Sequence, residues 1–187
     1  MARFLTACII VLVAATCGES LAQERDLVYT FIGPVAGGGF QHVTTRDWRN
    51  VYQKQSSAGN YYHGGCSIWV ISRWLIGDFS VQYANNRYER PLQHLYFTIS
   101  GKAAFTVKRI VTFAPGIGFY FELPPSNRGF RGGAGVRTPL AILFHTTFDT
   151  RLFIEGSFMY GWLGMGDRST KLSYGANLGF IFKVGRI

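Results

Sequence analysis

Apolar residues alternate with small or polar residues near the end of the chain. Every second position from Leu172 to Val184 is apolar, and the positions between them are small or polar except Ile181, with one charge at Lys183. A period of two predicts a β-strand with two different faces. A helix is disfavoured because each glycine inside it would cost about 1 kcal/mol relative to alanine. The apolar face would point to a core in a soluble sandwich and to lipid in a membrane barrel.

The same period predicts further strands over residues 27–36, 66–75, 79–84, 93–103, 109–123, 136–145 and 151–162. We expect the first strand to end at the glycines 37–39, followed by a long polar loop to residue 64. Short turns are expected at residues 76–78 and 146–150, and longer loops at 85–92, 124–133 and 163–170. The turn within residues 104–108 is not defined by the pattern. Eight strands with alternating short and longer connections are typical of a membrane barrel.

Aromatic residues on the predicted apolar face gather near the ends of the strands that carry the longer loops. They are Tyr83, Phe121, Tyr160, Trp162 and Tyr174. Membrane barrels keep aromatic girdles at the bilayer interfaces, whereas a soluble core has no reason for this placement. Charged residues make up 16% of the chain, against about 25% in soluble domains. Both features favour a lipid-facing surface.

The first residues have the features of an export signal. Arg3 is followed by a short apolar core over residues 4–17 and by small residues up to Ala22. This arrangement predicts a signal peptide over residues 1–22 and a single barrel domain over residues 23–187. The apolar core is shorter than the ~20 residues that a membrane-spanning helix needs. Cleavage would leave Cys66 as the only cysteine, so no internal disulfide is expected.

Charges on the opposite face of the strands predict a polar lumen. Arg137, Arg151, Glu155 and Lys183 fall on this face, and with Asn177 and His145 they would lie in the lumen or at its mouths. The interior of an eight-stranded barrel is just wide enough to be filled by side chains, so a wide aqueous pore is not expected. These residues would either form a polar plug or simply pair with one another, because an unpaired buried charge is costly.

The longer loops are expected to be basic, in a chain whose formal net charge is +9. Such loops would attract lipopolysaccharide or other anionic surface polymers, or would form a solvated rim. Nucleic-acid binding is not expected, since the chain carries an export signal and no recognition motif. The basic residues assigned to the loops are Arg46, Arg49, Lys54, Arg87, Arg90, Arg128, Arg131, Arg168 and Lys171, against Asp47, Glu89 and Asp167.

Catalytic and cofactor signals are sparse. The four histidines have no metal-ligand spacing, and the glycine runs match neither a dinucleotide nor a phosphate motif. One alternative is a lipid-deacylating barrel that uses Ser157 and His145 with Glu155 nearby, although no motif surrounds them. We expect no enzymatic activity, no cofactor and no metal.

The last strand carries a motif of known type. Asn177, Gly179, Phe182 and Val184 stand at the polar, glycine, aromatic and hydrophobic positions of a pattern that resembles the C-terminal assembly signal of outer-membrane barrels. That signal usually ends in Phe or Trp, whereas here residues 185–187 follow and the chain ends in Ile187. The resemblance implies recognition by the barrel-assembly machinery.

The whole mature chain resembles the small outer-membrane barrels of the OmpW, OmpX and opacity-protein type. The resemblance implies an all-β, eight-stranded, antiparallel up-and-down transmembrane barrel, in contact with outer-membrane lipid and without enzymatic activity. It further implies either a narrow channel for small or hydrophobic compounds or a role in adhesion or envelope structure. The alternative is a soluble secreted barrel, similar to a lipocalin, that binds an apolar ligand inside. The sequence does not define a substrate or an oligomeric state.

Overall fold

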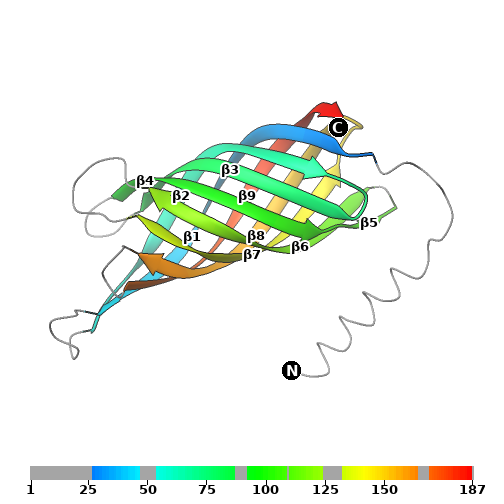
Figure 1. The fold of residues 1–187 in the computed structure, drawn as a ribbon. Helices are drawn as coiled ribbons and strands as arrows, with labels where there is room; N and C mark the ends of the chain where they lie inside the picture. The colour runs from blue at the N-terminus through cyan, green and yellow to red at the C-terminus, as the bar shows by residue number, and fades with distance from the viewer. Residues whose placement is uncertain are drawn as a thin grey trace, which may run out of the picture.

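A computed structural model describes residues 27–46, 54–86, 92–108, 110–123, 132–163 and 169–186, so the predicted signal peptide lies outside the described residues. The described chain is built from β-strands (Figure 1). They are β1 (Tyr29–Arg46), β2 (Lys54–Ile71), β3 (Leu75–Asn86), β4 (Leu92–Ala103), β5 (Phe105–Val107), β6 (Val111–Leu123), β7 (Gly133–His145), β8 (Thr150–Leu163) and β9 (Ser169–Arg186).

The strands form a closed antiparallel barrel, which confirms the predicted fold class. Each long strand pairs with its neighbours in the chain, and β1 closes the ring by pairing with β9. β4 pairs with β6, and the three-residue β5 extends the β4 side of that pairing beyond Ala104. The wall therefore consists of eight long strands. Closure matters because a bilayer offers no hydrogen-bond partner to an open sheet edge.

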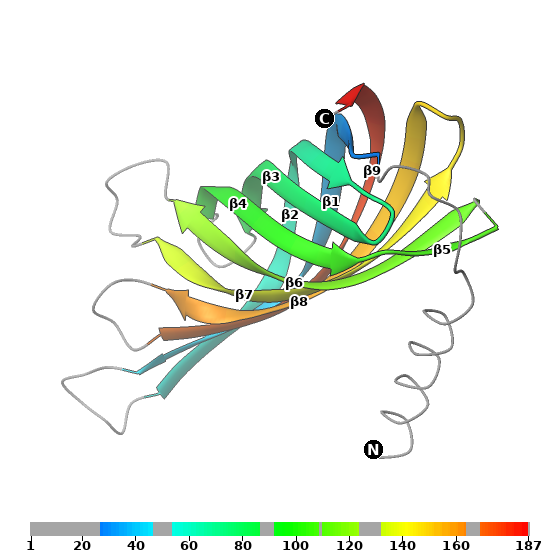
Figure 2. The same cartoon turned by 45° about the vertical axis from the view of Figure 1, so that its right-hand side comes forward.

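The connections fall at two ends of the barrel (Figure 2). At the loop end, segments 47–53, 87–91, 124–132 and 164–168 join β1 to β2, β3 to β4, β6 to β7 and β8 to β9. At the turn end lie the short turns after β2, β5 and β7, together with Leu27 and Arg186 as the first and last described residues. This is the arrangement that the alternating connection lengths predict.

The glycines 37–39 do not end the first strand, contrary to our prediction. β1 continues to Arg46 and pairs with β2 from Lys54 onward, so most of the segment expected to be a loop is strand. The glycines make room inside the barrel, since a Cβ on Gly39 would lie 2.9 Å from Cε1 of Tyr61. Glycine here allows close approach of a large inward ring and does not mark a turn.

The turn between β2 and β3 also differs from the prediction. It lies at residues 72–74, where Leu75 N donates to Ser72 Oγ over 3.0 Å and Ser72 N donates to Leu75 O over 2.9 Å. Ile76 and Asp78, which we expected in a turn, are instead buried inside β3. The undefined turn before β6 contains Lys108, whose φ is 50°. The turn before β8 occurs at the predicted place, with Thr147 N donating to Thr150 O.

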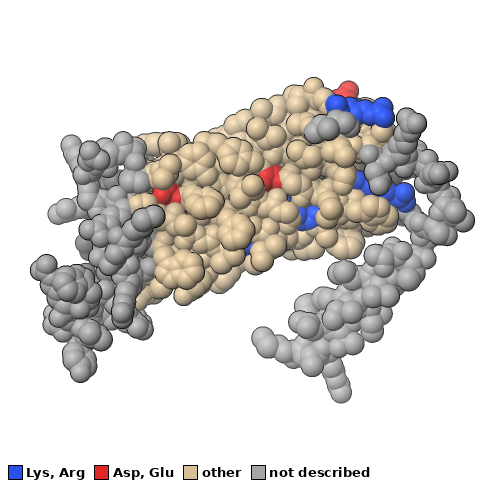
Figure 3. Space-filling view, in the orientation of Figure 1, with Lys and Arg blue, Asp and Glu red and all other residues tan. Residues whose placement is uncertain are grey.

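The outer surface of the barrel is apolar. Ile99, Ile117, Leu140 and Leu178 are each more than half exposed, and the five predicted girdle aromatics have exposed fractions of 44–58%. Few charged atoms interrupt the long side in view (Figure 3). A soluble domain would not expose such a continuous apolar surface. The barrel is therefore of the membrane-spanning kind. Separately, the described residues include no helix long and apolar enough to cross a membrane.

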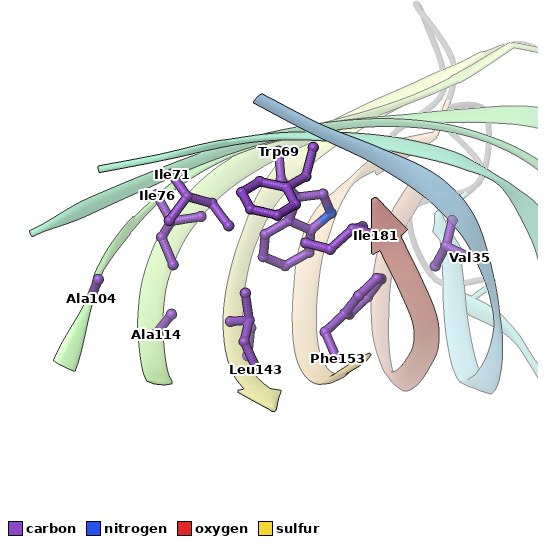
Figure 4. Packing of buried hydrophobic residues seen from close by; sticks show 11 residues of the cluster. Val35, Trp69, Ile71, Ile76, Ala104, Ala114, Leu143, Phe153 and Ile181 are labelled. Carbon is purple, nitrogen blue, oxygen red and sulfur yellow. The ribbon is translucent and has the colours of Figure 1, made fainter. Parts of the chain in front are cut away.

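An apolar layer fills the interior near the turn end, where we expected a polar lumen. The rings of Trp69 and Phe153 lie 4.7 Å apart between centroids, and both side chains are 1% exposed. Figure 4 shows these rings converging with aliphatic side chains from several strands. We call this group the apolar layer; its larger members are Phe31, Val35, Trp69, Ile71, Ile76, Leu143, Phe153 and Ile181.

Candidate functional site

The candidate site is the part of the lumen between the apolar layer and the loop end. Each strand directs every second residue inward, so the alternation that makes the outer face apolar also brings polar side chains together inside. The buried polar side chains include glutamine, serine and threonine as well as charged residues. The charged members come from different strands: Asp78, Lys102, Glu122, Arg137, Glu155 and Lys171.

Four of these residues form what we call the central network: Asp78, Lys102, Arg137 and Glu155. The Lys102 ammonium pairs with Asp78 Oδ1 and lies 3.0 Å from Glu155 Oε2. Arg137 Nη2 donates to Glu155 Oε1. All four residues are no more than 6% exposed, so their charges are withdrawn from solvent. The charges of two cations balance those of two anions. This balance is expected because a buried charge without a partner is costly.

The central network reaches across the barrel. Lys102 lies on β4 and Glu155 on β8, with β6 and β7 between them on the wall, so their ion pair crosses the interior. Asn177 Nδ2 on β9 donates to Glu155 Oε1 over 3.2 Å, and its Oδ1 lies 2.5 Å from His63 Nε2 on β2. The network thus links strands on opposite sides of the lumen.

A second ion pair lies closer to the loop end. Lys171 Nζ on β9 donates to Glu122 Oε1 on β6, and His94 Nε2 is 3.9 Å from the same oxygen. The rings of Tyr61 and Tyr120 stand 5.9 and 5.7 Å from the Lys171 ammonium. We call Lys171 and Glu122 the loop-side pair. Together with the apolar layer and the central network, it completes three layers of buried side chains along the lumen.

The apolar layer and the central network are in direct contact. Lys102 Nζ lies 4.3 Å from the centre of the Trp69 ring, and its side chain is fully buried. A cation over an aromatic face gains further stabilisation when it is desolvated. Lys102 is therefore held by two carboxylates and one indole ring, at the boundary between the two layers.

The predicted lumen residues have different positions. Arg137 and Glu155 are paired in the central network. Lys183 lies apart from it at the turn end, 3.8 Å from Asp149 and over the rings of Tyr29 and Phe148.

The predicted basic loop residues are mostly outside the described part of the chain: Arg49, Arg87, Arg90, Arg128, Arg131 and Arg168. The assignment of Arg46 and Lys54 to a loop is wrong. Arg46 is the last residue of β1, and its backbone is paired with that of Lys54, the first residue of β2. Lys171 is also misassigned, since it is buried in the lumen with Glu122. The alternation of β9 continues through Ser173 to Lys171, and this continuation accounts for its inward position.

Sequence reasoning missed Asp78, Lys102, Glu122 and His63 as lumen residues. Asp78 was placed in a turn and His63 in a loop, although each lies in phase with an inward residue two positions away: Ser80 for Asp78 and Tyr61 for His63. Lys102 and Glu122 fall on the predicted inward faces of their strands. Extending the period of two to the full length of each strand would have found all of them.

The motif of the last strand is divided between the two faces. Asn177 points inward to the network, while Phe182 and Val184 are 49% and 61% exposed on the outer face. A Cβ on Gly179 would lie 2.6 Å from Cε1 of Phe153, so glycine leaves room for that ring. Recognition of the motif by the assembly machinery stays a prediction.

The residues of the lipid-deacylating alternative are not brought together. His145 lies near the turn end, 2.9 Å from Thr112 Oγ1, and pairs in register with Arg151. Ser157 lies about 20 Å farther along β8 at the usual rise per residue. Glu155 is engaged in the central network. Within the described residues, no group of three or more His, Cys, Asp and Glu side chains is placed to hold a metal ion.

Comparison with known proteins shows that the fold of this chain is similar to that of solved structures. No protein-family model matches the chain, and no curated protein sequence matches it. The outer membrane protein OprG from Pseudomonas aeruginosa has a similar structure, with a TM-score of 0.55 and 12% identity over 85% of this chain and 97% of that one. Weaker similarity is found to Neisserial surface protein A (TM-score 0.44, 15% identity, 78% and 96% covered) and to Ail of Yersinia pestis (0.43, 13%, 82% and 99%).

Proposed function

We propose that this protein is an integral outer-membrane β-barrel with a sealed lumen, which serves the envelope as a structural or surface-presenting protein. The observation that carries the proposal is the ion pair between Lys102 and Glu155, which crosses the lumen of a barrel whose outer surface is apolar. The apolar surface is suited to contact with lipid, and the closed wall leaves no strand edge without hydrogen-bond partners in the membrane. The crossing ion pairs and the apolar layer oppose free diffusion along the axis.

The outer membrane is the membrane that fits this fold. Bacterial membrane barrels of this size have an even number of antiparallel strands with an outward apolar band. The predicted signal peptide and the predicted assembly motif support the same location. OprG, which shares the fold, is described as an outer membrane protein.

The soluble lipocalin-like alternative is not favoured. It needs aromatic residues turned inward around a ligand and polar residues outward, whereas this barrel exposes Phe119, Phe121 and Trp162 and buries Arg137 and Glu155. An enzymatic role has no support from the lumen either, because its buried carboxylates neutralise buried cations and so are not free to act as acids or bases. We therefore infer a non-enzymatic role.

The proposal is tested by refolding the mature chain into detergent and into lipid vesicles. A folded membrane barrel should migrate differently on a gel before and after heating, and a soluble protein should show no such shift. Ion conductance should then stay at the level of protein-free bilayers, because the lumen is filled. Conductance or uptake of a hydrophobic dye above that background would contradict the sealed lumen and support the narrow-channel alternative.

Contacts of the loops with anionic surface polymers remain part of the proposal. Arg87, Arg90, Arg128 and Arg131 belong to the segments at the loop end and give them a basic composition. Attraction of this kind is screened by salt. Binding of the refolded barrel to lipopolysaccharide should therefore weaken as ionic strength rises.

A further inference from the structure

The turn end of the barrel carries an excess of basic residues. Arg73, Lys108 and Arg186 are exposed, while Arg151 and Lys183 are half-buried at the mouth of the lumen, where Arg151 Cζ lies 4.6 Å from the centre of the buried Phe31 ring. The described residues outside the lumen at this end include a single acid, Asp149. Figure 3 shows Lys and Arg atoms gathered at this end of the molecule. We call the five basic residues the basic collar: Arg73, Lys108, Arg151, Lys183 and Arg186.

Aromatic rings accompany the collar. Lys183 Nζ lies 4.0 Å from the centre of the Phe148 ring and 4.2 Å from that of Tyr29, and Arg73 Cζ lies 4.9 Å from the Trp74 ring. Phe148 is 74% exposed, so its ring is accessible on the surface and is not packed in the barrel interior. Aromatic and basic side chains at one level are the mark of a membrane interface.

The collar also borders the apolar surface. Four apolar residues within two positions of a collar residue are each more than half exposed: Leu75, Val107, Ile110 and Val184. In a bilayer, the phosphates of the lipid headgroups lie at the edge of the hydrocarbon region. The collar would therefore stand at the depth of those phosphates when the apolar surface is covered by lipid.

We propose that the basic collar binds the anionic headgroups of phospholipids in the leaflet that the turn end faces. This inference rests on the proposed membrane location and goes beyond it by naming a lipid class and a site. Each Lys or Arg near an anionic surface contributes attraction that falls off within a Debye length. Lys183 and Arg186 lie at the same end of β9, and Lys183 Nζ stands over the exposed ring of Phe148, where a headgroup would be bound.

The experiment places a fluorescent reporter at the collar. Phe148→Trp is made in a chain where Trp48, Trp74 and Trp162 are replaced by Phe, while Trp69 stays because it is enclosed in the barrel. The protein is refolded into phosphatidylcholine vesicles that contain about a quarter phosphatidylglycerol. Bromine atoms are placed on the acyl chains of one lipid or of the other. Quenching by brominated phosphatidylglycerol relative to brominated phosphatidylcholine then measures the headgroup selectivity beside residue 148.

Two variants of opposite charge sign make the test specific. Arg186→Gln should lower the selectivity roughly fivefold at low salt, and Asp149→Asn should raise it by a similar factor. Arg87→Gln, in a loop-end segment, is the matched control and should leave it unchanged. Equal quenching by the two lipids, or the same loss with Arg87→Gln, would overturn the inference. No quenching by either lipid in a folded, inserted barrel would also overturn it.

Failure of the proposed function would give a different experimental result from failure of the collar proposal. If the chain does not insert into any vesicle and shows no heat-dependent gel shift, the membrane location is wrong and the inference falls with it. Insertion without selectivity contradicts the collar proposal alone.

Discussion

Arg137 and Glu155 form an ion pair inside the barrel across the neighbouring strands β7 and β8. Arg137 is in register with Met159 and Glu155 with Ala141, so the pair runs diagonally between the strands. This diagonal reach leaves the second oxygen of Glu155 facing Lys102 from the other side of the lumen. One carboxylate therefore pairs with two cations on different parts of the wall, and Asp78 supplies the second negative charge.

Glu155→Gln should destabilise the barrel strongly. The amide cannot neutralise Arg137 and Lys102, and removal of one partner from a buried ion pair costs about 3–5 kcal/mol. The free energy of unfolding is measured by urea titration of the refolded barrel, with the heat-dependent gel shift as the signal.

The matched control is Asp149→Asn, which makes the same chemical change at a carboxylate that is 69% exposed. Its ion pair with Lys183 should contribute less than about 1 kcal/mol. Adding Arg137→Met to Glu155→Gln should recover part of the loss, since one uncompensated cation is removed. Equal effects of Glu155→Gln and Asp149→Asn would contradict the importance of the central network.

A charge on the outer face should be destabilising in proportion to its depth. Leu178 lies in the middle of β9, opposite Ile154 and Ala36, and Val184 lies on the same face near the turn end. Leu178→Arg should cost about 2–4 kcal/mol and Val184→Arg about 0–1 kcal/mol in vesicles. Both residues are more than half exposed, so a soluble barrel would tolerate both changes alike. Equal unfolding free energies for the two variants would argue against the lipid-facing surface.

The seam that closes the barrel depends on a glycine. A Cβ on Gly33 would lie 2.8 Å from the carbonyl carbon of Phe180 and 2.9 Å from Cα of Ile181, both backbone atoms of β9. Gly33→Ala should therefore separate β1 from β9 and cost about 1–3 kcal/mol. Gly77→Ala is the control, because a Cβ there meets nothing within 4 Å. The folded fraction after refolding should fall for Gly33→Ala only. A similar fall for both variants would contradict the claim that close approach of β1 and β9 at Gly33 is the cause.

The architecture was predictable because a membrane barrel repeats one rule along the whole chain. Lipid outside and a narrow lumen inside require alternation on every strand, and residues 172–184 display it fully. Strand ends were less predictable. The glycines 37–39 look like a turn, yet Gly39 accommodates the Tyr61 ring, which comes from another strand. That contact depends on the register between β1 and β2, which residue types alone do not define.

The central network was predictable only in part for a related reason. Arg137 and Glu155 lie in the middle of long strands, where the alternation is unambiguous. Asp78 and Lys171 lie near strand ends: Asp78 follows Gly77, a pair that is equally typical of a turn, and Lys171 follows the polar residues 167–170 that we assigned to a loop. The apolar layer was missed because Trp69 and Ile71 are apolar residues on an inward face, and alternation does not distinguish an apolar interior from a lipid-facing surface.

Phe182→Ala should impair assembly in cells without impairing the finished fold. Phe182 is 49% exposed on the outer face, so its loss removes lipid contact and leaves the interior layers intact. If it forms part of the assembly signal, the folded fraction of exported protein should fall, while purified protein refolded into vesicles should reach the normal yield. Phe180→Ala is the matched control, since Phe180 is on the same face of β9 and 46% exposed but stands outside the four motif positions. The heat-dependent gel shift of isolated envelopes measures both variants. Equal losses for the two would mean that β9 requires aromatic contact with lipid in general, and would contradict a specific role of Phe182 in recognition.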